Sequence, residues 1–96
     1  MSALPPKPRI AVIGAGWAGL AAAVRSVQLG AEVTLIEMAR VPGGRARAVP
    51  LPAGRFDNGQ HILIGAYTAT LALMRCVGAD PDRLLMRRPL ALVDPA

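Results

Sequence analysis

The chain has 96 residues, of which 53% are hydrophobic and 18% are charged, a composition that excludes an intrinsically disordered protein. Its formal net charge is +5, but its arginines are scattered and no aromatic residues alternate with them, which argues against a nucleic-acid-binding protein. The excess of positive charge is then best explained by binding of an anionic cofactor or of an anionic membrane surface. One histidine and one cysteine exclude an internal disulfide and a structural metal site.

The first third of the chain predicts a strand, a helix and a second strand. A proline-rich tail over residues 1–8 precedes the apolar run 9–13, which is typical of a buried parallel strand. Apolar residues recur at helical spacing over residues 17–29, and Gly30 is placed to end that helix. Residues 32–37 predict the second strand. This order predicts an α/β fold, a Rossmann-like βαβ unit.

Loops and turns dominate the middle of the chain. Residues 38–44 predict a loop, and residues 45–49 a short extended piece. Two prolines and a glycine predict a turn over residues 50–54. Residues 56–65 mix polar side chains with glycine, which is typical of a functional loop.

A second helix is predicted over residues 67–77, where Gly78 is placed to end it. Cys76 lies in this apolar stretch and is expected to pack as a small buried side chain. A turn is predicted over residues 80–82, and a further extended segment over residues 84–93.

The turn between the first strand and the first helix has glycine at its first, third and sixth positions, residues 14–19. Gly14 permits the sharp turn off the strand, and Gly16 lets the backbone approach a pyrophosphate. Gly19 lets the helix lie close to the strands. Free N–H groups and the positive end of the helix then face the phosphates. In this context the glycine spacing predicts a dinucleotide-binding site.

Three further residues belong to the predicted cofactor site. Trp17 and Ala18 lie inside the glycine turn, where Trp17 is expected to pack over the first helical turn without a chemical role. Glu37 ends the second strand, where its carboxylate can accept hydrogen bonds from the hydroxyls of an adenosine ribose.

Gly43, Gly44 and Arg45 follow Glu37 at a spacing that extends the glycine pattern. The whole pattern resembles the N-terminus of the FAD-dependent amine oxidases and carotenoid desaturases, in which an acidic residue followed by a Gly-Gly-Arg string is distinctive. The resemblance implies FAD as the cofactor. Many amine oxidases have an arginine two positions after the acidic residue. Here that residue is Ala39, so this contact to adenine does not carry over.

A second string, residues 56–61 followed by residues 65–67, is similar to the squalene-associated FAD-dependent desaturases, which include the hydroxysqualene dehydroxylases of bacterial hopanoid synthesis. The resemblance covers residues 9–94. It implies a full-length FAD-dependent oxidoreductase that acts on a long hydrophobic isoprenoid and removes the hydroxyl of hydroxysqualene to give squalene. Two alternatives stay open: a carotenoid desaturase or amine oxidase of the same superfamily, and a truncated nucleotide-binding module without catalytic activity.

The arginines near the second strand are candidates for phosphate binding. Gly44 and its neighbour give a tight backbone that carries Arg45 towards the cofactor, where a planar guanidinium can bind two pyrophosphate oxygens. Arg40 and Arg47 are left open between a cofactor contact and a solvated surface position.

The resemblance also implies roles near the flavin ring. Gly59 and its neighbours are expected against the isoalloxazine, where Gln60 can hydrogen-bond or orient the flavin. His61 is the catalytic candidate, as a proton donor or acceptor, with a satisfied and partly buried histidine as the equal alternative.

Two strands and one crossover helix are too little for a stable doubly wound sheet, because a parallel sheet needs cover on both faces. Residues 9–96 are therefore expected to be the incomplete N-terminal portion of a larger FAD/NAD(P)-binding domain. The 96-residue chain alone is expected to be inactive. A cytoplasmic location is expected, with peripheral attachment to the inner face of the membrane as a further possibility, and the oligomeric state is left open.

Overall fold

The structure, a computed structural model, describes residues 5–58 and 62–95. The chain divides into two compact units, Met1–Ile62 and Leu63–Ala96. The helices and strands follow in the order β1 (Arg9–Ile13), α1 (Trp17–Gln28), β2 (Glu32–Ile36), β3 (Ala48–Leu51), β4 (Gly54–Asp57), α2 (Thr68–Cys76) and α3 (Pro81–Leu84).

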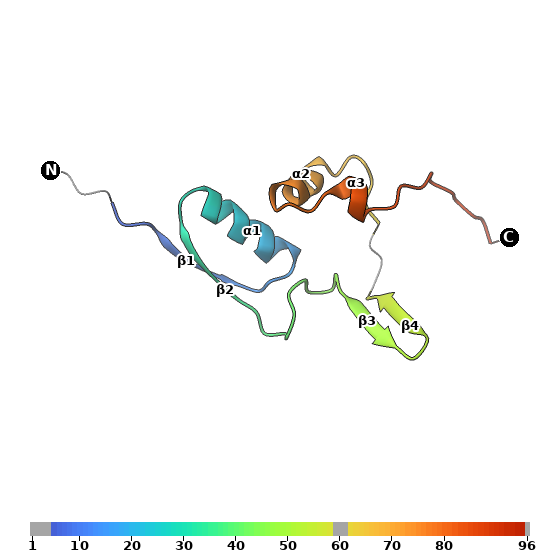
Figure 1. The fold of residues 1–96 in the computed structure, drawn as a ribbon, viewed down its shortest axis with the longest axis horizontal. Helices are drawn as coiled ribbons and strands as arrows, with labels where there is room; N and C mark the ends of the chain where they lie inside the picture. The colour runs from blue at the N-terminus through green and yellow to red at the C-terminus, as the bar shows by residue number, and fades with distance from the viewer. Residues whose placement is uncertain (1–4, 59–61, 96) are drawn as a thin grey trace. The chain divides into compact units, whose positions relative to one another are not determined.

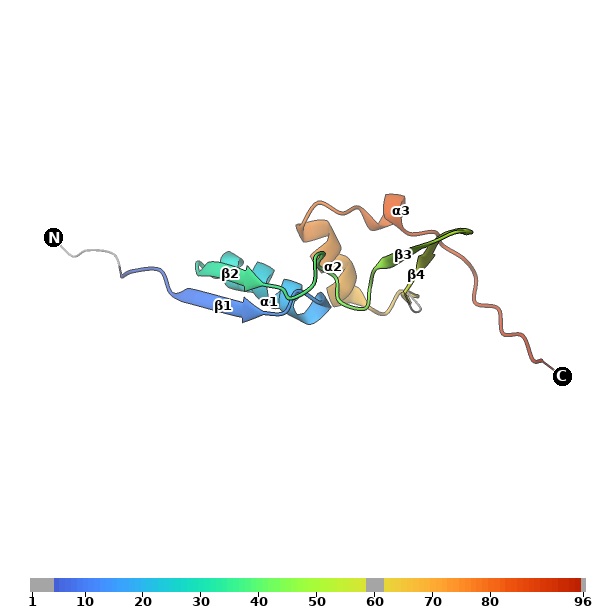
Figure 2. The ribbon, with the colours of Figure 1, turned by 90° about the horizontal axis from the view of Figure 1, so that it is seen from below.

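The first unit is built on the predicted strand–helix–strand order, which the structure confirms (Figure 1). β1 and β2 pair in parallel, so that Ile10 lies opposite Val33 and Ile13 opposite Ile36. Figure 2 shows the two strands side by side and running in the same direction. α1 packs against both strands as their crossover connection. Parallel strands need such a crossover because the chain leaves the first strand at one end of the sheet and must enter the second strand at the other end.

α1 covers one face of the β1–β2 pair and leaves the other face open. Val12 and Val33 are half-buried, and the Val12 side chain lies beside Gly19 of α1. Side chains alternate along a strand, so Ile13 and Ile36 fall on the opposite face. Their side chains are 76% and 49% exposed. Parallel sheets are normally covered on both faces.

β3 and β4 form an antiparallel hairpin, in which Val49 pairs with Phe56 and Leu51 with Gly54. The extended piece predicted over residues 45–49 overlaps the start of β3, and the turn predicted over residues 50–54 contains the reversal of the chain. The prediction was wrong in ending the extended piece before Pro50 and in missing β4. Pro50 lies within β3, where a two-stranded ribbon tolerates a residue that has no N–H because every strand in it is an edge.

The second unit contains α2 and the short helix α3. Gly78 follows α2 with a φ of 83°, and its N–H donates to the Arg75 carbonyl at 3.1 Å. The predicted helix and its glycine stop are confirmed. Cys76 is exposed, so the expectation of a buried thiol was wrong. Within this unit α2 packs against α3, a helix of four residues that cannot cover every face of α2.

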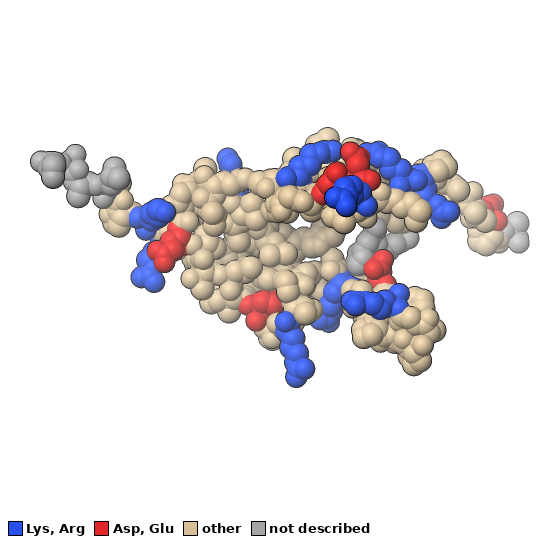
Figure 3. Space-filling model, in the orientation of Figure 1, with Lys and Arg blue, Asp and Glu red and all other residues tan. Residues whose placement is uncertain are grey.

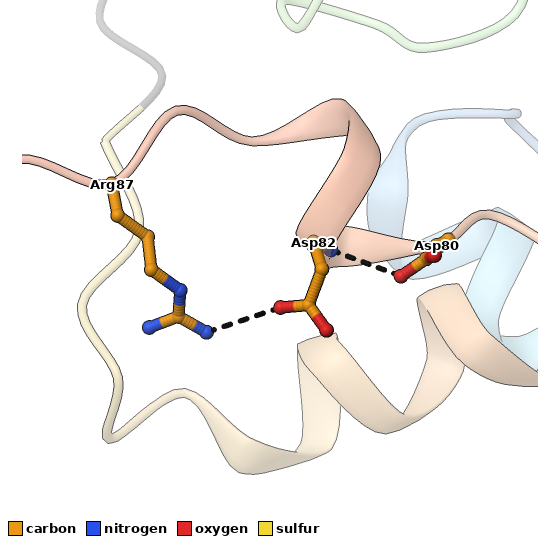
Figure 4. Close-up of polar contacts among 3 residues, drawn as sticks. All are labelled: Asp80, Asp82 and Arg87. Atoms are coloured by element: carbon orange, nitrogen blue, oxygen red, sulfur yellow. Dashed lines mark hydrogen bonds and ion pairs between the residues drawn. The ribbon is translucent and has the colours of Figure 1, made fainter.

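The predicted turn over residues 80–82 is the start of α3. The Asp82 N–H donates to the Asp80 carboxylate at 3.0 Å, and Pro81 occupies the first turn of the helix (Figure 4). An acidic N-cap followed by proline is a favourable helix start. Arg87 pairs with Asp82 at 3.5 Å between exposed side chains, a contact worth little in water (Figure 4). Residues 85–95 form neither helix nor strand, so the extended segment predicted over residues 84–93 does not pair into a sheet.

Candidate functional site

The glycine turn leaves the start of α1 open to a ligand. Gly14 turns the chain off β1 with a φ of 100°, and its N–H donates to the Ile36 carbonyl at 2.7 Å. Gly16 is the N-cap of α1 and has no side chain to cap the helix, and the first turn has no acidic residue. The N–H groups and the positive end of α1 can therefore serve an anion.

Gly19 brings α1 close to the strands. A Cβ at this position would overlap the Gly14 carbonyl oxygen and would lie 3.6 Å from Cγ1 of Val12. Any side chain here would therefore push the helix away from β1. Gly19 acts on the site through this close packing of helix and turn.

The Glu37 carboxylate is held by two backbone donors. The Ala15 N–H donates to Oε1 at 2.9 Å, and the Ala39 N–H donates to Oε2 at 3.1 Å. These two hydrogen bonds, Ala15 first, lower the pKa of Glu37. Burial raises the pKa by less, and the positive charge of Arg47 lowers it by the smallest amount. The carboxylate is therefore ionised at neutral pH. Each oxygen keeps a lone pair that can accept a ligand hydroxyl.

The loop after β2 folds back onto the glycine turn. The Gly43 N–H donates to the Ala15 carbonyl at 2.7 Å. Gly44 has a φ of 62°, and a Cβ on it would lie 3.2 Å from the Gly16 Cα. Two backbones without side chains can approach this closely. The loop that carries Arg45 is thus seated directly on the turn.

The turn, this loop and Asn58, the residue after β4, line an open groove of about 850 Å³, within the size range of ligand pockets. Its lining residues are Gly16, Trp17, Ala18, Ala39, Gly43, Gly44, Arg45, Ala46, Arg47 and Asn58.

The groove brings together five of the residues that the sequence predicted for the cofactor site, namely Gly16, Trp17, Ala18, Gly44 and Arg45. Three other predicted residues that the structure describes do not line the groove: Gly14, Gly19 and Glu37. They contribute through their contacts within the glycine turn. Trp17 is 52% exposed at the groove. The predicted flavin-ring residues Gly59 and Gln60 and the catalytic candidate His61 lie outside the described residues, so their roles stay predictions.

The groove also contains residues that sequence reasoning did not place there. Arg47 was left open between a cofactor contact and a surface position. Asn58 was expected beside Gly59 at the flavin ring, in a loop over residues 56–65. The structure places Phe56 and Asp57 on β4 instead. The Asn58 N–H donates to the Arg47 carbonyl at 2.7 Å, which holds the end of the hairpin against the loop. In the sequence, the only indication that Arg47 belongs to the site was its position two residues after Arg45.

The residues present fit a dinucleotide. A Cβ on Gly16 would meet no atom within 4 Å, so the backbone here is open for a ligand group to approach. Helix N–H groups and two arginines suit a diphosphate, and an ionised carboxylate suits ribose hydroxyls. Among residues 5–58 and 62–95, no group of three His, Cys, Asp or Glu residues could hold a metal ion.

Comparisons with known proteins show which family the chain resembles. The NAD(P)-binding Rossmann-like domain family matches residues 12–77. The chain is 50% identical over 81 residues to the hydroxyneurosporene desaturase of Rhodobacter capsulatus, which covers 84% of this chain and 16% of that protein. It is 37% identical over 81 residues to the chloroplastic/chromoplastic zeta-carotene desaturase of Zea mays, covering 83% of this chain and 14% of that protein.

A third relative is the phytoene dehydrogenase of Streptomyces griseus, with 43% identity over 58 residues, covering 60% of this chain and 11% of that protein. The chain thus spans between 11% and 16% of the length of these relatives. The family match begins near the end of β1 and includes the glycine turn, α1, β2 and the groove loop. The chain belongs to the family of NAD(P)-binding Rossmann-like domains.

Proposed function

We propose that the intact protein is an FAD-dependent oxidoreductase that desaturates a long isoprenoid of the carotenoid type. The observation that carries this proposal is the similarity to hydroxyneurosporene and zeta-carotene desaturases, which extends over more than four-fifths of the chain. A hydrophobic isoprenoid is the corresponding substrate class.

In this proposal the chain provides the binding of the adenosine diphosphate half of the cofactor. The N–H groups at the start of α1 and the Arg45 guanidinium bind the diphosphate, to which the bare Gly16 backbone gives access. The Glu37 carboxylate accepts hydrogen bonds from the ribose hydroxyls, while it also accepts those from the Ala15 and Ala39 N–H groups. A bound flavin supplies the redox chemistry by accepting two electrons from the substrate as a carbon–carbon double bond forms.

The choice of FAD over a nicotinamide cofactor is supported by the Gly43-Gly44-Arg45 loop, which lies in the groove and resembles the FAD-dependent family. The test is to purify the intact protein and identify the released nucleotide by its absorption spectrum and mass. We expect FAD. Release of NAD(P) alone, with no binding of added FAD, would contradict the assignment.

A second function, removal of the hydroxyl of hydroxysqualene, is supported by one observation. The string over residues 56–61 resembles the squalene-associated desaturases more than it resembles the wider superfamily. The two reactions move electrons in opposite directions. Desaturation removes two hydrogens and reduces the flavin, whereas replacement of a hydroxyl by hydrogen consumes a reduced flavin.

This difference in electron flow defines the experiment that separates the two functions. Without oxygen, the oxidised protein is mixed with an unsaturated carotene precursor, and the reduced protein with hydroxysqualene. We expect the flavin absorbance to bleach with the carotene precursor, together with a red shift of the polyene spectrum as conjugation lengthens. Recovery of flavin absorbance with hydroxysqualene, and squalene as the product by mass, would favour dehydroxylation instead.

The location of the protein is part of the proposal. A cytoplasmic protein that meets its substrate at the inner face of a membrane would suit an isoprenoid with little solubility in water. No helix within residues 5–58 and 62–95 has the length and apolar character needed to cross a membrane. Separation of cells into soluble and membrane fractions, with a salt wash of the membranes, tests for peripheral attachment.

A further inference from the structure

We propose that Arg47 is a second cationic residue for the diphosphate of the bound dinucleotide. The inference rests on the proposed function, because it takes an adenosine diphosphate group as the occupant. The sequence left this residue open between a cofactor contact and a solvated surface position, and the family resemblance gives it no role.

The first observation is position. Arg47 lines the groove together with Arg45, whereas Arg40, on the same loop between β2 and β3, does not. Two other lining residues, Ala39 and Ala46, have only methyl side chains and take up little of the groove. A long guanidinium side chain therefore has room to reach a ligand in the groove.

The second observation is how the backbone of Arg47 is held. The Asn58 N–H donates to the Arg47 carbonyl at 2.7 Å, and the next residue, Ala48, pairs with Asp57 in the hairpin. The hairpin thus fixes the point from which the arginine side chain extends. A fixed starting point lowers the conformational entropy that a side chain loses when it binds a ligand.

The third observation is electrostatic. Arg47 lines the groove, and its positive charge makes the smallest of the contributions that shift the pKa of the Glu37 carboxylate. A diphosphate next to an ionised carboxylate would meet like-charge repulsion. A cation that faces both groups offsets this repulsion, and arginine can share its N–H donors between them.

The experiment measures FAD binding by quenching of flavin fluorescence in the intact apoprotein, at low and high salt. We expect Arg47→Gln to weaken FAD binding roughly 10-fold at low salt and to reduce the salt dependence of the dissociation constant. Arg40→Gln is the matched control, with the same charge change on the same loop, and should stay within about twofold. Arg47→Lys should recover part of the loss, because it restores the charge without the guanidinium fork.

The outcomes separate the two proposals. If wild-type protein binds NAD and not FAD, the proposed function fails, and the same variants measured with NAD decide the role of Arg47, since both ligands contain adenosine diphosphate. If Arg47→Gln and Arg40→Gln behave alike in affinity and salt dependence, the role of Arg47 is overturned. If Arg47→Gln does not fold, the comparison of Arg47→Lys with Arg40→Lys gives the same decision.

Discussion

Ala15 joins three segments of the chain through its backbone. Its N–H donates to the Glu37 carboxylate and its carbonyl accepts from the Gly43 N–H. Ala15 is 1% exposed, so its own N–H and carbonyl groups are buried. A buried backbone group that loses its partner is costly, and this makes the three segments depend on one another.

Glu37→Gln should weaken FAD binding roughly 10-fold, the scale of a lost charge-assisted hydrogen bond. The amide has one acceptor oxygen where the carboxylate has two, so it cannot accept from both Ala15 and Ala39 and also from a ribose. The measurement is equilibrium dialysis of FAD against the intact protein. Glu32→Gln, at the exposed start of β2, is the control and should leave binding unchanged.

The same carboxylate predicts a dependence of stability on pH. The pKa of Glu37 in the fold lies below its ordinary value of 4.5, chiefly because of the Ala15 and Ala39 hydrogen bonds. A carboxylate with a lowered pKa adds stability that is fully present above the unfolded pKa and is lost as the pH falls through the folded pKa. The difference in unfolding free energy between wild type and Glu37→Gln should therefore be constant near neutral pH and shrink below pH 4.5. A difference that grows on acidification would contradict the assignment.

Gly16→Val should separate folding from binding. No atom lies within 4 Å of a Cβ on Gly16, and its backbone is extended with a φ of −73°, so valine fits the fold. The new side chain points into the space that the diphosphate needs. We expect colourless protein after purification, with the same thermal midpoint as the flavin-free wild-type protein. Yellow protein with full flavin content would show that the cofactor binds elsewhere.

At the scale of elements, the packing of α1 against β1 depends on the contact between Gly19 and Gly14. Helix propensity alone would make Gly19→Ala stabilising by about 1 kcal/mol. The added methyl group would clash with the Gly14 carbonyl oxygen, and this cost outweighs the gain in helix propensity. We therefore expect Gly19→Ala to lower the free energy of unfolding by about 1–3 kcal/mol or more. Chemical denaturation of the intact protein measures this. Gly65→Ala is the control, since a Cβ there meets no atom within 4 Å, and it should be close to neutral.

The β3–β4 hairpin shows where prediction of elements from sequence stopped. Two prolines and a glycine over residues 50–54 were read as one turn, yet β3 continues through Pro50 to Leu51 before the chain reverses. Proline removes a donor, but in a two-stranded ribbon each residue pairs on one side only. The loss of one N–H therefore did not end the strand. Asp80 and Pro81 were likewise read as a turn, although together they start α3.

At the scale of the whole molecule, the described residues bury very little. Among residues 5–58 and 62–95, the buried apolar side chains are Ala15 and Pro81. Large apolar side chains such as Ile13, Leu29 and Met86 are 69% exposed or more. Burial of apolar surface is the main term that offsets the loss of chain entropy on folding.

The 96-residue chain on its own is therefore expected to unfold without a cooperative transition and to lose flavin on dialysis. Scanning calorimetry of the isolated chain, with and without added FAD, is the measurement. The intact protein is the control and should unfold cooperatively. A sharp calorimetric peak for the isolated chain that moves to higher temperature with FAD would contradict this prediction.

The sequence by itself determined the β1–α1–β2 unit and its glycine turn, because both depend on residues that are neighbours along the chain. Apolar runs set the strands, and glycine at fixed spacing sets the turn and the close helix. Only the tertiary structure decided which residues share the groove. The Ala15 backbone contacts Glu37 and Gly43, and Asn58 meets Arg47, across gaps in the sequence that no local pattern spans. Those contacts arise because the loop after β2 folds back onto the turn, a closure that depends on backbone hydrogen bonds and on two glycines in close contact.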